Sequence, residues 1–166
     1  MAESGGQGLG NEPRSFDEEL HAAFLRMDRL LATRDRSELE LRQRLERAGF
    51  SAEVVSTVVA FALDAGYISD ERFAHAFVNG KARLGWGRGR IEWELRRFGI
   101  DILTLEGYPA AFYEDEDDLQ RAVGVLIRFH TRSKNMREAQ YRHLVNKGFS
   151  ADIAQKALTQ LTHSAS

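Results

Sequence analysis

Hydrophobic residues recur along most of the chain at intervals of three and four, with polar residues between them. That spacing is typical of helices that bury one face. Glycines and polar breaks divide the pattern into nine segments, each of which we expect to be an α-helix. Their expected ranges are 16–33, 37–48 and 52–63, then 70–84, 88–98 and 102–113, and finally 117–130, 134–147 and 151–162.

Two of these segments carry features that compete with a helix. The run from Val54 to Val59 is rich in β-branched residues, which would also suit a strand. Its apolar residues nevertheless follow a helical stripe, so we expect a helix there. Pro109 lies inside the segment 102–113. We expect a kink, a break or a short helix at this point, because proline donates no backbone hydrogen bond.

The chain also repeats itself at intervals of about fifty residues. The segment Gly49–Ala52 reappears as Gly148–Ala151, and Gly99–Ile102 lies between them. In each copy a glycine ends one helix, an apolar residue follows, and a Ser or Asp opens the next helix. A period of this length indicates a tandem helical array. We therefore expect an all-α fold, an elongated array of three three-helix repeats, with a disordered N-terminal tail at 1–15 and repeats at 16–66, 67–113 and 114–163.

The densest motif lies between residues 66 and 100. Gly-Tyr-Ile-x-Asp-x-Arg-Phe-Ala opens it, and Gly-x-Gly-x-x-Arg-Ile follows after a helical pattern. The order and spacing of these residues resemble the central signature of the RecX family of bacterial recombinase regulators, although Arg88 stands where that family often has proline. The signature residues are Gly66, Tyr67, Asp70, Arg72, Phe73, Gly85, Gly87, Ile91, Leu95 and Gly99.

This resemblance implies a function as well as a fold. RecX-like proteins consist of tandem three-helix repeats, and they bind the filament that the RecA recombinase forms on single-stranded DNA. They inhibit strand exchange, ATP hydrolysis and the co-protease role of that filament, and so modulate recombination and the SOS response to DNA damage. If this chain acts similarly, its partners are RecA and the single-stranded DNA within the filament.

The net charge of −2 hides an uneven distribution. Residues 26–97 carry +3 and residues 119–166 carry +6, whereas residues 1–25 carry −4 and residues 98–118 carry −7. Arginine outnumbers lysine nineteen to four, and its planar guanidinium group suits phosphate and carboxylate recognition. Two basic blocks are therefore available to a partner. The alternative interpretation is a solvated helical surface with ordinary ion pairs.

The helix expected at 88–98 has an unusual polar face. A helical projection places Trp93 among arginines, opposite the apolar residues. Tryptophan and arginine dominate the binding energy of many interfaces, although Trp93 could instead pack against a neighbouring repeat. The residues that we expect to contact the filament or DNA are Arg83, Arg88, Arg90, Trp93, Arg97, Arg132, Lys134, Arg137 and Arg142. The first repeat adds a further basic set, at Arg34, Arg36, Arg42, Arg44 and Arg47.

No combination of residues indicates catalysis or metal binding. The chain has no cysteine, its five histidines lack metal-ligand spacing, and the glycine-rich turn lacks the Gly-Lys-Ser/Thr ending of a phosphate loop. We therefore expect no enzymatic activity, no metal and no cofactor.

The sequence also shows no signal peptide and no apolar run of the ~20 residues that a membrane span needs. We expect a cytoplasmic, monomeric protein. The alternative function that the sequence leaves open is a helical-repeat nucleic-acid-binding protein without a recombinase partner.

Overall fold

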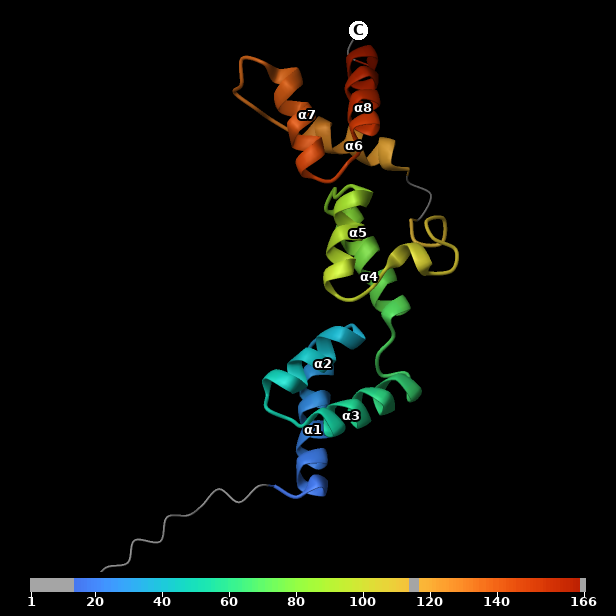
Figure 1. The fold of residues 1–166 in the computed structure, drawn as a ribbon. Helices are drawn as coiled ribbons and strands as arrows, with labels where there is room; N and C mark the ends of the chain where they lie inside the picture. The colour runs from blue at the N-terminus through green and yellow to red at the C-terminus, as the bar shows by residue number, and fades with distance from the viewer. Residues whose placement is uncertain (1–13, 114–116, 165–166) are drawn as a thin grey trace, which may run out of the picture.

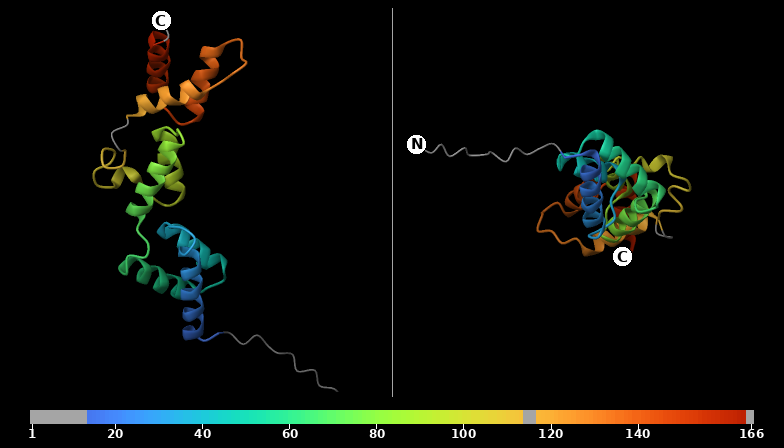
Figure 2. Two further views of the ribbon diagram at one scale, coloured as in Figure 1. Left: turned by 180° about the vertical axis from the view of Figure 1, so that it is seen from behind. Right: turned by 90° about the horizontal axis from the view of Figure 1, so that it is seen from below.

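The computed structural model describes residues 14–113 and 117–164, and every regular element in these two ranges is a helix. The helices form three groups that follow one another along an elongated molecule (Figure 1, Figure 2). The expected all-α array of helical repeats is therefore confirmed. Most of the tail that we expect to be disordered, residues 1–13, lies outside the described residues.

The first repeat consists of α1 (Phe16–Leu31), α2 (Glu38–Arg47) and α3 (Ala52–Asp64). A serine precedes each helix, and its hydroxyl accepts a backbone N–H of the first turn. This hydrogen bond satisfies a donor that has no partner within the helix. α3 is a helix and not a strand, as its apolar stripe predicts. The residues that it buries against α1 and α2 are Val54, Val55, Val58, Val59 and Ala62.

The second repeat consists of α4 (Asp70–Arg83), α5 (Arg88–Arg97) and a short 3₁₀ helix, η1 (Ile102–Thr104). Its hydrophobic core is built from the inner faces of α4 and α5 together with the chain on either side of η1. The buried residues of this core include Phe73, Val78, Ile91, Leu95, Ile100, Ile102 and Phe112.

The prediction of a full α-helix over 102–113 is wrong, whereas the break or short helix expected because of Pro109 is confirmed. After η1 the chain continues in turns as far as Tyr113. Proline explains the difference, because Pro109 lacks an N–H and disfavours helical backbone at the residue before it. Gly107, with a φ of 75°, adds a second break. The second repeat therefore has two α-helices where the other two repeats have three.

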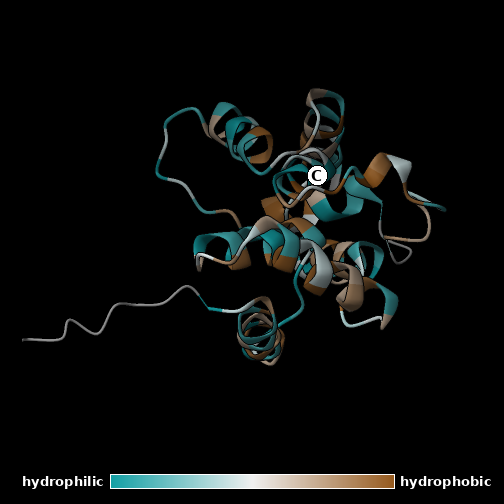
Figure 3. Cartoon of the chain, turned by 60° about the horizontal axis from the view of Figure 1, so that its bottom comes forward, coloured by the Kyte–Doolittle hydropathy of each residue, from teal (hydrophilic) through white to brown (hydrophobic). Residues whose placement is uncertain are grey.

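The third repeat consists of α6 (Asp118–Arg128), α7 (Met136–Asn146) and α8 (Ala151–Ser164). Hydrophobic and hydrophilic residues alternate around most helices of the molecule (Figure 3). Each repeat can therefore enclose a small core of its own. The buried residues of the third core are Ala122, Val125, Leu126, Leu144, Phe149, Ala154, Ala157 and Leu158.

The middle helices α2, α5 and α7 lie on the same side of the molecule, and the carboxyl end of one meets the amino end of the one before it (Figure 1). Gly99, just after α5, lies against Leu39 in the first turn of α2. Gly148, just after α7, lies against Arg90 in the first turn of α5. Both glycines have a positive φ, 80° and 92°, which residues with a side chain rarely adopt. The same kind of joint is thus used twice.

Backbone meets backbone at the joint between the second and third repeats. The Gly87 N–H donates to the Lys147 carbonyl at 2.8 Å, and the Gly89 N–H donates to the Gly148 carbonyl at 3.2 Å. A Cβ atom on Gly87 would lie 2.4 Å from the Gly148 carbonyl carbon and from the Phe149 nitrogen. Gly87 therefore serves the packing of two repeats as well as the turn between α4 and α5.

Charged residues at the start of α4 help to hold the first and second repeats together. The Asp70 carboxylate accepts the Glu38 N–H at 2.8 Å, so it caps α2 from the next repeat. Burial raises the pKa of Asp70, although this hydrogen bond opposes the shift. Arg72 donates to the Gly66 and Tyr67 carbonyls, at 3.3 and 3.0 Å, and so binds the chain that follows α3. These contacts give four signature residues a role in packing.

Gly87→Ala should lower the free energy of unfolding by about 1–3 kcal/mol, because an added methyl group forces two tightly packed backbones apart. Urea denaturation followed by circular dichroism measures this loss. The matched control is Gly80→Ala in α4, where an added Cβ meets nothing within 4 Å and should stabilise the helix by about 0.4–1 kcal/mol. Wild-type stability in the Gly87→Ala variant would show that the joint is looser than described.

Candidate interaction surface

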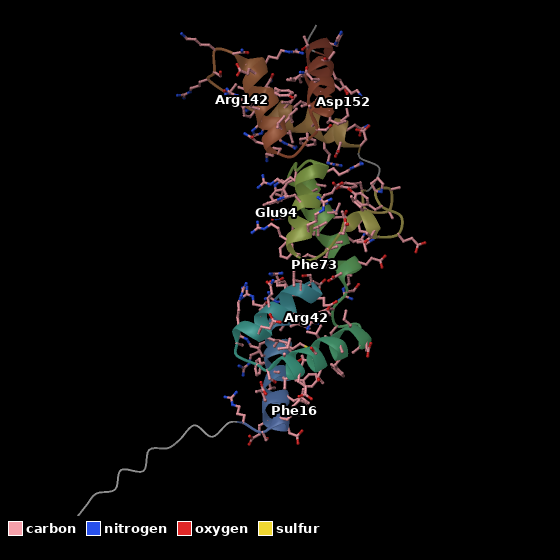
Figure 4. All side chains as sticks on the ribbon, viewed as in Figure 1. Phe16, Arg42, Phe73, Glu94, Arg142 and Asp152 are labelled. Atoms are coloured by element: carbon pink, nitrogen blue, oxygen red, sulfur yellow. The ribbon has the colours of Figure 1, made fainter. Side chains whose placement is uncertain are left out.

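The three middle helices carry many of the exposed arginines of the molecule. Nitrogen-tipped side chains project from α2, α5 and α7 on the side that these helices share (Figure 4). A surface of this kind, spread over three repeats, can contact an extended partner at several points. The exposed arginines of the middle helices are Arg44, Arg47, Arg96, Arg97, Arg137 and Arg142.

Trp93 lies on the outer face of α5, with 55% of its surface exposed. The helical projection predicts this placement, and so large an exposure is incompatible with burial between two repeats. The guanidinium carbon of Arg97 lies 5.1 Å from the centre of the Trp93 ring, and Arg97 also pairs with Glu94 at 3.3 Å. Trp93 and Arg97 thus form an exposed cation–π pair. Their part in binding a partner stays a prediction.

Arg90 lies in the joint between the second and third repeats. Its guanidinium carbon lies 3.8 Å from the centre of the Trp86 ring, and its backbone packs against Gly148. Lys81 lies over the same tryptophan ring at 4.7 Å. Arg90 is therefore only partly exposed, and it supports Trp86; its part in binding a partner stays a prediction.

Trp86 was not among the expected contact residues, although a regular spacing in the sequence reveals it. Trp86, Arg90, Trp93 and Arg97 follow one another at intervals of four, three and four residues. The last three share one face of α5, whereas Trp86 lies in the turn just before the N-cap Gly87. In the structure each arginine lies over the tryptophan four residues before it. We call these four residues the Trp–Arg stripe. It begins in the turn before α5 and continues along that helix to Arg97 near its carboxyl end.

Arg88 also lies where the second and third repeats meet. Its Nε is 3.7 Å from the Asp118 carboxylate, and its guanidinium carbon is 5.0 Å from the centre of the Tyr113 ring. Arg121, which is 5% exposed, pairs with the same carboxylate and lies 4.8 Å from the same ring. Burial raises the pKa of Tyr113, and both arginines oppose that shift. Arg83, the expected contact residue on the other side of the α4–α5 turn, is exposed, whereas Arg88 is only partly exposed.

The basic set of the first repeat divides into structural and exposed members. Arg36 is 7% exposed and donates to the Leu30 carbonyl at 3.0 Å, so it satisfies the carboxyl end of α1. Arg34 and Arg36 pair with Glu40 at 2.5 and 2.6 Å. Within the described ranges, the members of this set that are exposed and form no ion pair are Arg44 and Arg47.

The expected contact residues of the third repeat are all exposed. Arg132 and Lys134 lie in the segment between α6 and α7, and Arg137 lies in the first turn of α7. Arg142 lies one turn after Glu138 and pairs with it at 3.9 Å. An exposed ion pair of this kind contributes little to stability, so all four cations remain accessible to a partner.

A cleft between the second and third repeats adds further basic groups. It is lined by Leu84 after α4, by Arg128 of α6 and by His143 and Lys147 near the end of α7. The His143 ring stacks on that of Phe129 with 4.2 Å between their centres. Burial, and to a smaller extent Lys147, lowers the pKa of His143.

Among the residues that the structure describes, no three His, Asp or Glu side chains come together as a metal site requires. None of the helices seen there is both long and apolar enough to cross a lipid bilayer. What the middle helices offer a partner is a series of arginines and one exposed tryptophan.

The fold and the arginine-rich side define this protein as a helical-repeat array, an architecture that creates extended surfaces. Two family models match this chain. The model described as RecX, first three-helix domain, matches residues 23–61, and the model described as RecX, second three-helix domain, matches residues 69–102. The first match covers most of α1 to α3, and the second covers α4, α5 and the start of η1.

Relatives extend this similarity over most of the chain. Regulatory protein RecX of Pseudomonas fluorescens is 30% identical over 135 residues, which are 78% of this chain and 85% of that protein. Regulatory protein RecX of Caldanaerobacter subterraneus subsp. tengcongensis is 30% identical over 133 residues, which are 78% of this chain but only 66% of that protein's length. The chain belongs to the RecX family, as its central signature predicts.

A solved structure shares the fold. The crystal structure of RecX from Lactobacillus salivarius superimposes with a TM-score of 0.75, covering 89% of this chain and 99% of the other, at 20% sequence identity. At this level of identity the likeness concerns the fold alone. It supports an elongated helical array, in agreement with the repeat found in the sequence.

Trp93→Ala should change the free energy of unfolding by less than about 0.5 kcal/mol, because an exposed side chain contributes little to packing. Trp86→Ala is the matched control. Its ring packs against the core of the second repeat, so its loss should cost about 1.5–2.5 kcal/mol, roughly half the value for a fully buried tryptophan. Urea denaturation measures both changes. A loss of several kcal/mol in the Trp93 variant would contradict its surface placement.

Proposed function

We propose that this protein regulates the RecA recombinase by binding the filament that RecA forms on single-stranded DNA. Bound there, it inhibits strand exchange, ATP hydrolysis and the co-protease activity of the filament, and it thereby modulates recombination and the SOS response. It acts by binding and performs no chemistry of its own. Membership of the RecX family supports this proposal, since the matched relatives are named regulatory proteins.

The observation that carries the proposal is the arrangement of α2, α5 and α7 on one side of an elongated molecule. Two glycine joints hold these helices end to end, so exposed arginines of all three repeats are spread along the length of the protein. A nucleoprotein filament is itself repetitive and offers anionic sites at intervals. An extended ligand then gains several weak contacts at once, and their combined affinity exceeds that of any single contact.

A nucleic-acid-binding protein without a recombinase partner is the alternative function. The charge distribution favours the filament over bare DNA. Residues 98–118 carry −7, and a bare polyanion would repel them. A filament, in contrast, presents both protein and phosphate, so a molecule with basic and acidic regions can be accommodated on it.

Addition of the protein should suppress the DNA-dependent ATP hydrolysis of a bacterial RecA at amounts equal to or below that of RecA. A protein that binds the filament differently in its different states is coupled to the hydrolytic cycle and can slow it. A coupled ATPase assay with single-stranded DNA measures the effect, and the protein alone is the control that should hydrolyse no ATP. An unchanged rate at saturating protein would exclude a recombinase regulator.

Reversing the charge of Arg132, Lys134 and Arg137 to glutamate should weaken filament binding and reduce its dependence on salt. Each lost phosphate contact on a single strand lowers the slope of log affinity against log salt by about 0.7. Because these side chains are exposed, each change should alter stability by no more than about 0.5 kcal/mol. Co-sedimentation with RecA filaments over a salt series measures binding. Unfolding of the variant would place these cations in the structure of the third repeat instead.

A further inference from the structure

A groove lies between α2 of the first repeat and the carboxyl end of α5 in the second. Three arginines line it, Arg44 and Arg47 from α2 and Arg97 from α5. Because two repeats supply its walls, the groove exists only while they are stacked. The other residues along its walls are Leu39, Glu40, Gln43 and Phe98.

The walls of this groove leave much of its positive charge unneutralised. Arg44 and Arg47 are exposed and form no ion pair with any residue that the structure describes. Glu40 is already paired, with Arg34 at 2.5 Å and with Arg36 at 2.6 Å. The groove is therefore suited to an anionic ligand.

Trp93 lies on α5 one turn before Arg97, which lines the groove, and so adds an exposed aromatic ring beside it. Arg97 lies 5.1 Å from the centre of the Trp93 ring, and 63% of the Arg97 side chain is exposed although it pairs with Glu94. Trp93 itself is 55% exposed. Trp86, by contrast, packs against the core of the second repeat and has Arg90 over its ring at 3.8 Å. Within the Trp–Arg stripe, Trp93 is therefore the ring that a ligand can reach.

We propose that this groove, with Trp93 at its edge, binds single-stranded nucleic acid. A base stacks on the open face of Trp93, and the phosphates that follow it lie along Arg97, Arg44 and Arg47. Guanidinium groups match phosphate oxygens, and an aromatic ring accepts any base. The inference rests on the proposed function, because the filament is what brings a single strand to this protein. It assigns the contact with the strand to the joint between the first and second repeats.

An acidic segment of a partner protein is the other anion that could lie here. The groove favours nucleic acid because its apolar lining, Leu39 and Phe98, offers little for the hydrophobic anchors on which protein interfaces depend. Cations that follow an exposed ring are also the arrangement by which proteins hold single strands.

Trp93 reports on this site directly when Trp86→Phe leaves it as the single tryptophan. Titration of that protein with an oligothymidylate of about 16 nucleotides, long enough for a groove of this kind, should quench the Trp93 emission. The titration contains no RecA, so it tests the groove separately from filament regulation. Fluorescence anisotropy of a labelled oligothymidylate then gives the affinity over a salt series.

Two variants test the assigned roles by anisotropy. Arg44→Glu combined with Arg47→Glu should lower the slope of log affinity against log salt by about 1.4, since each phosphate contact on a single strand contributes about 0.7. Trp93→Ala should weaken binding about 5- to 150-fold, the loss expected for one stacked base. The matched control reverses Arg26 and Arg29 of α1, which are also exposed and three residues apart. Thermal melts should show that all three variants fold.

Equal weakening by the control pair would reveal a general effect of charge and overturn the site. Undiminished oligonucleotide binding by the groove variants would also overturn it, and a simultaneous loss of RecA inhibition would mean that this surface binds protein. Wild-type protein that inhibits RecA without binding the oligonucleotide would overturn the inference and leave the proposed function intact. Oligonucleotide binding at the groove without any RecA inhibition would overturn the proposed function and leave the groove as a binding site for single strands.

Discussion

Gly87 and Gly148 meet with no side chain between them, and the N–H groups of Gly87 and Gly89 donate to carbonyls just beyond α7. A joint between hydrophobic side chains could rearrange at modest cost, whereas this one is fixed by backbone contact and by directional hydrogen bonds. The direction of α7 relative to α5 follows from it. The glycine-rich turn of the signature is therefore best understood as the place where two repeats are locked together.

The joint between the first and second repeats involves equivalent positions, the end of one middle helix and the start of another, but the contacts made there differ. Gly99 again ends a middle helix, but it lies against the Leu39 side chain instead of a backbone. An acid at the start of the next repeat contacts the first turn of the middle helix in both joints, Asp70 through the Glu38 N–H and Asp118 through the Arg88 guanidinium group. The middle helices are thus aligned twice by equivalent contacts. This alignment gives the molecule one long side on which a partner can lie.

Arginine is used in two ways in this protein. Arg36 and Arg121 are nearly buried and satisfy carbonyl or carboxylate groups, because a guanidinium group can serve several acceptors at once. Others, such as Arg44 and Arg47, are exposed without an ion pair to any described residue. Composition alone cannot separate these uses. Exposed arginines that form no such contacts lie in the groove and on the long side of the molecule.

The sequence by itself determined eight of the nine expected helices, the fifty-residue repeat and the family, because apolar spacing, serine caps and glycine ends act within a few residues of one another. It also predicted that Trp93 lies opposite the apolar face of its helix, since a helical face is a local property, and the structure then showed that no described part of another repeat buries it. Only the tertiary structure decided which cations are free. Arg88 meets Asp118 thirty residues away, and Arg90 packs against Gly148. The groove of Arg44, Arg47 and Arg97 likewise exists only where α2 and α5 are stacked. Such contacts depend on how the repeats pack, and the local sequence pattern of one helix does not show which other helix lies against it.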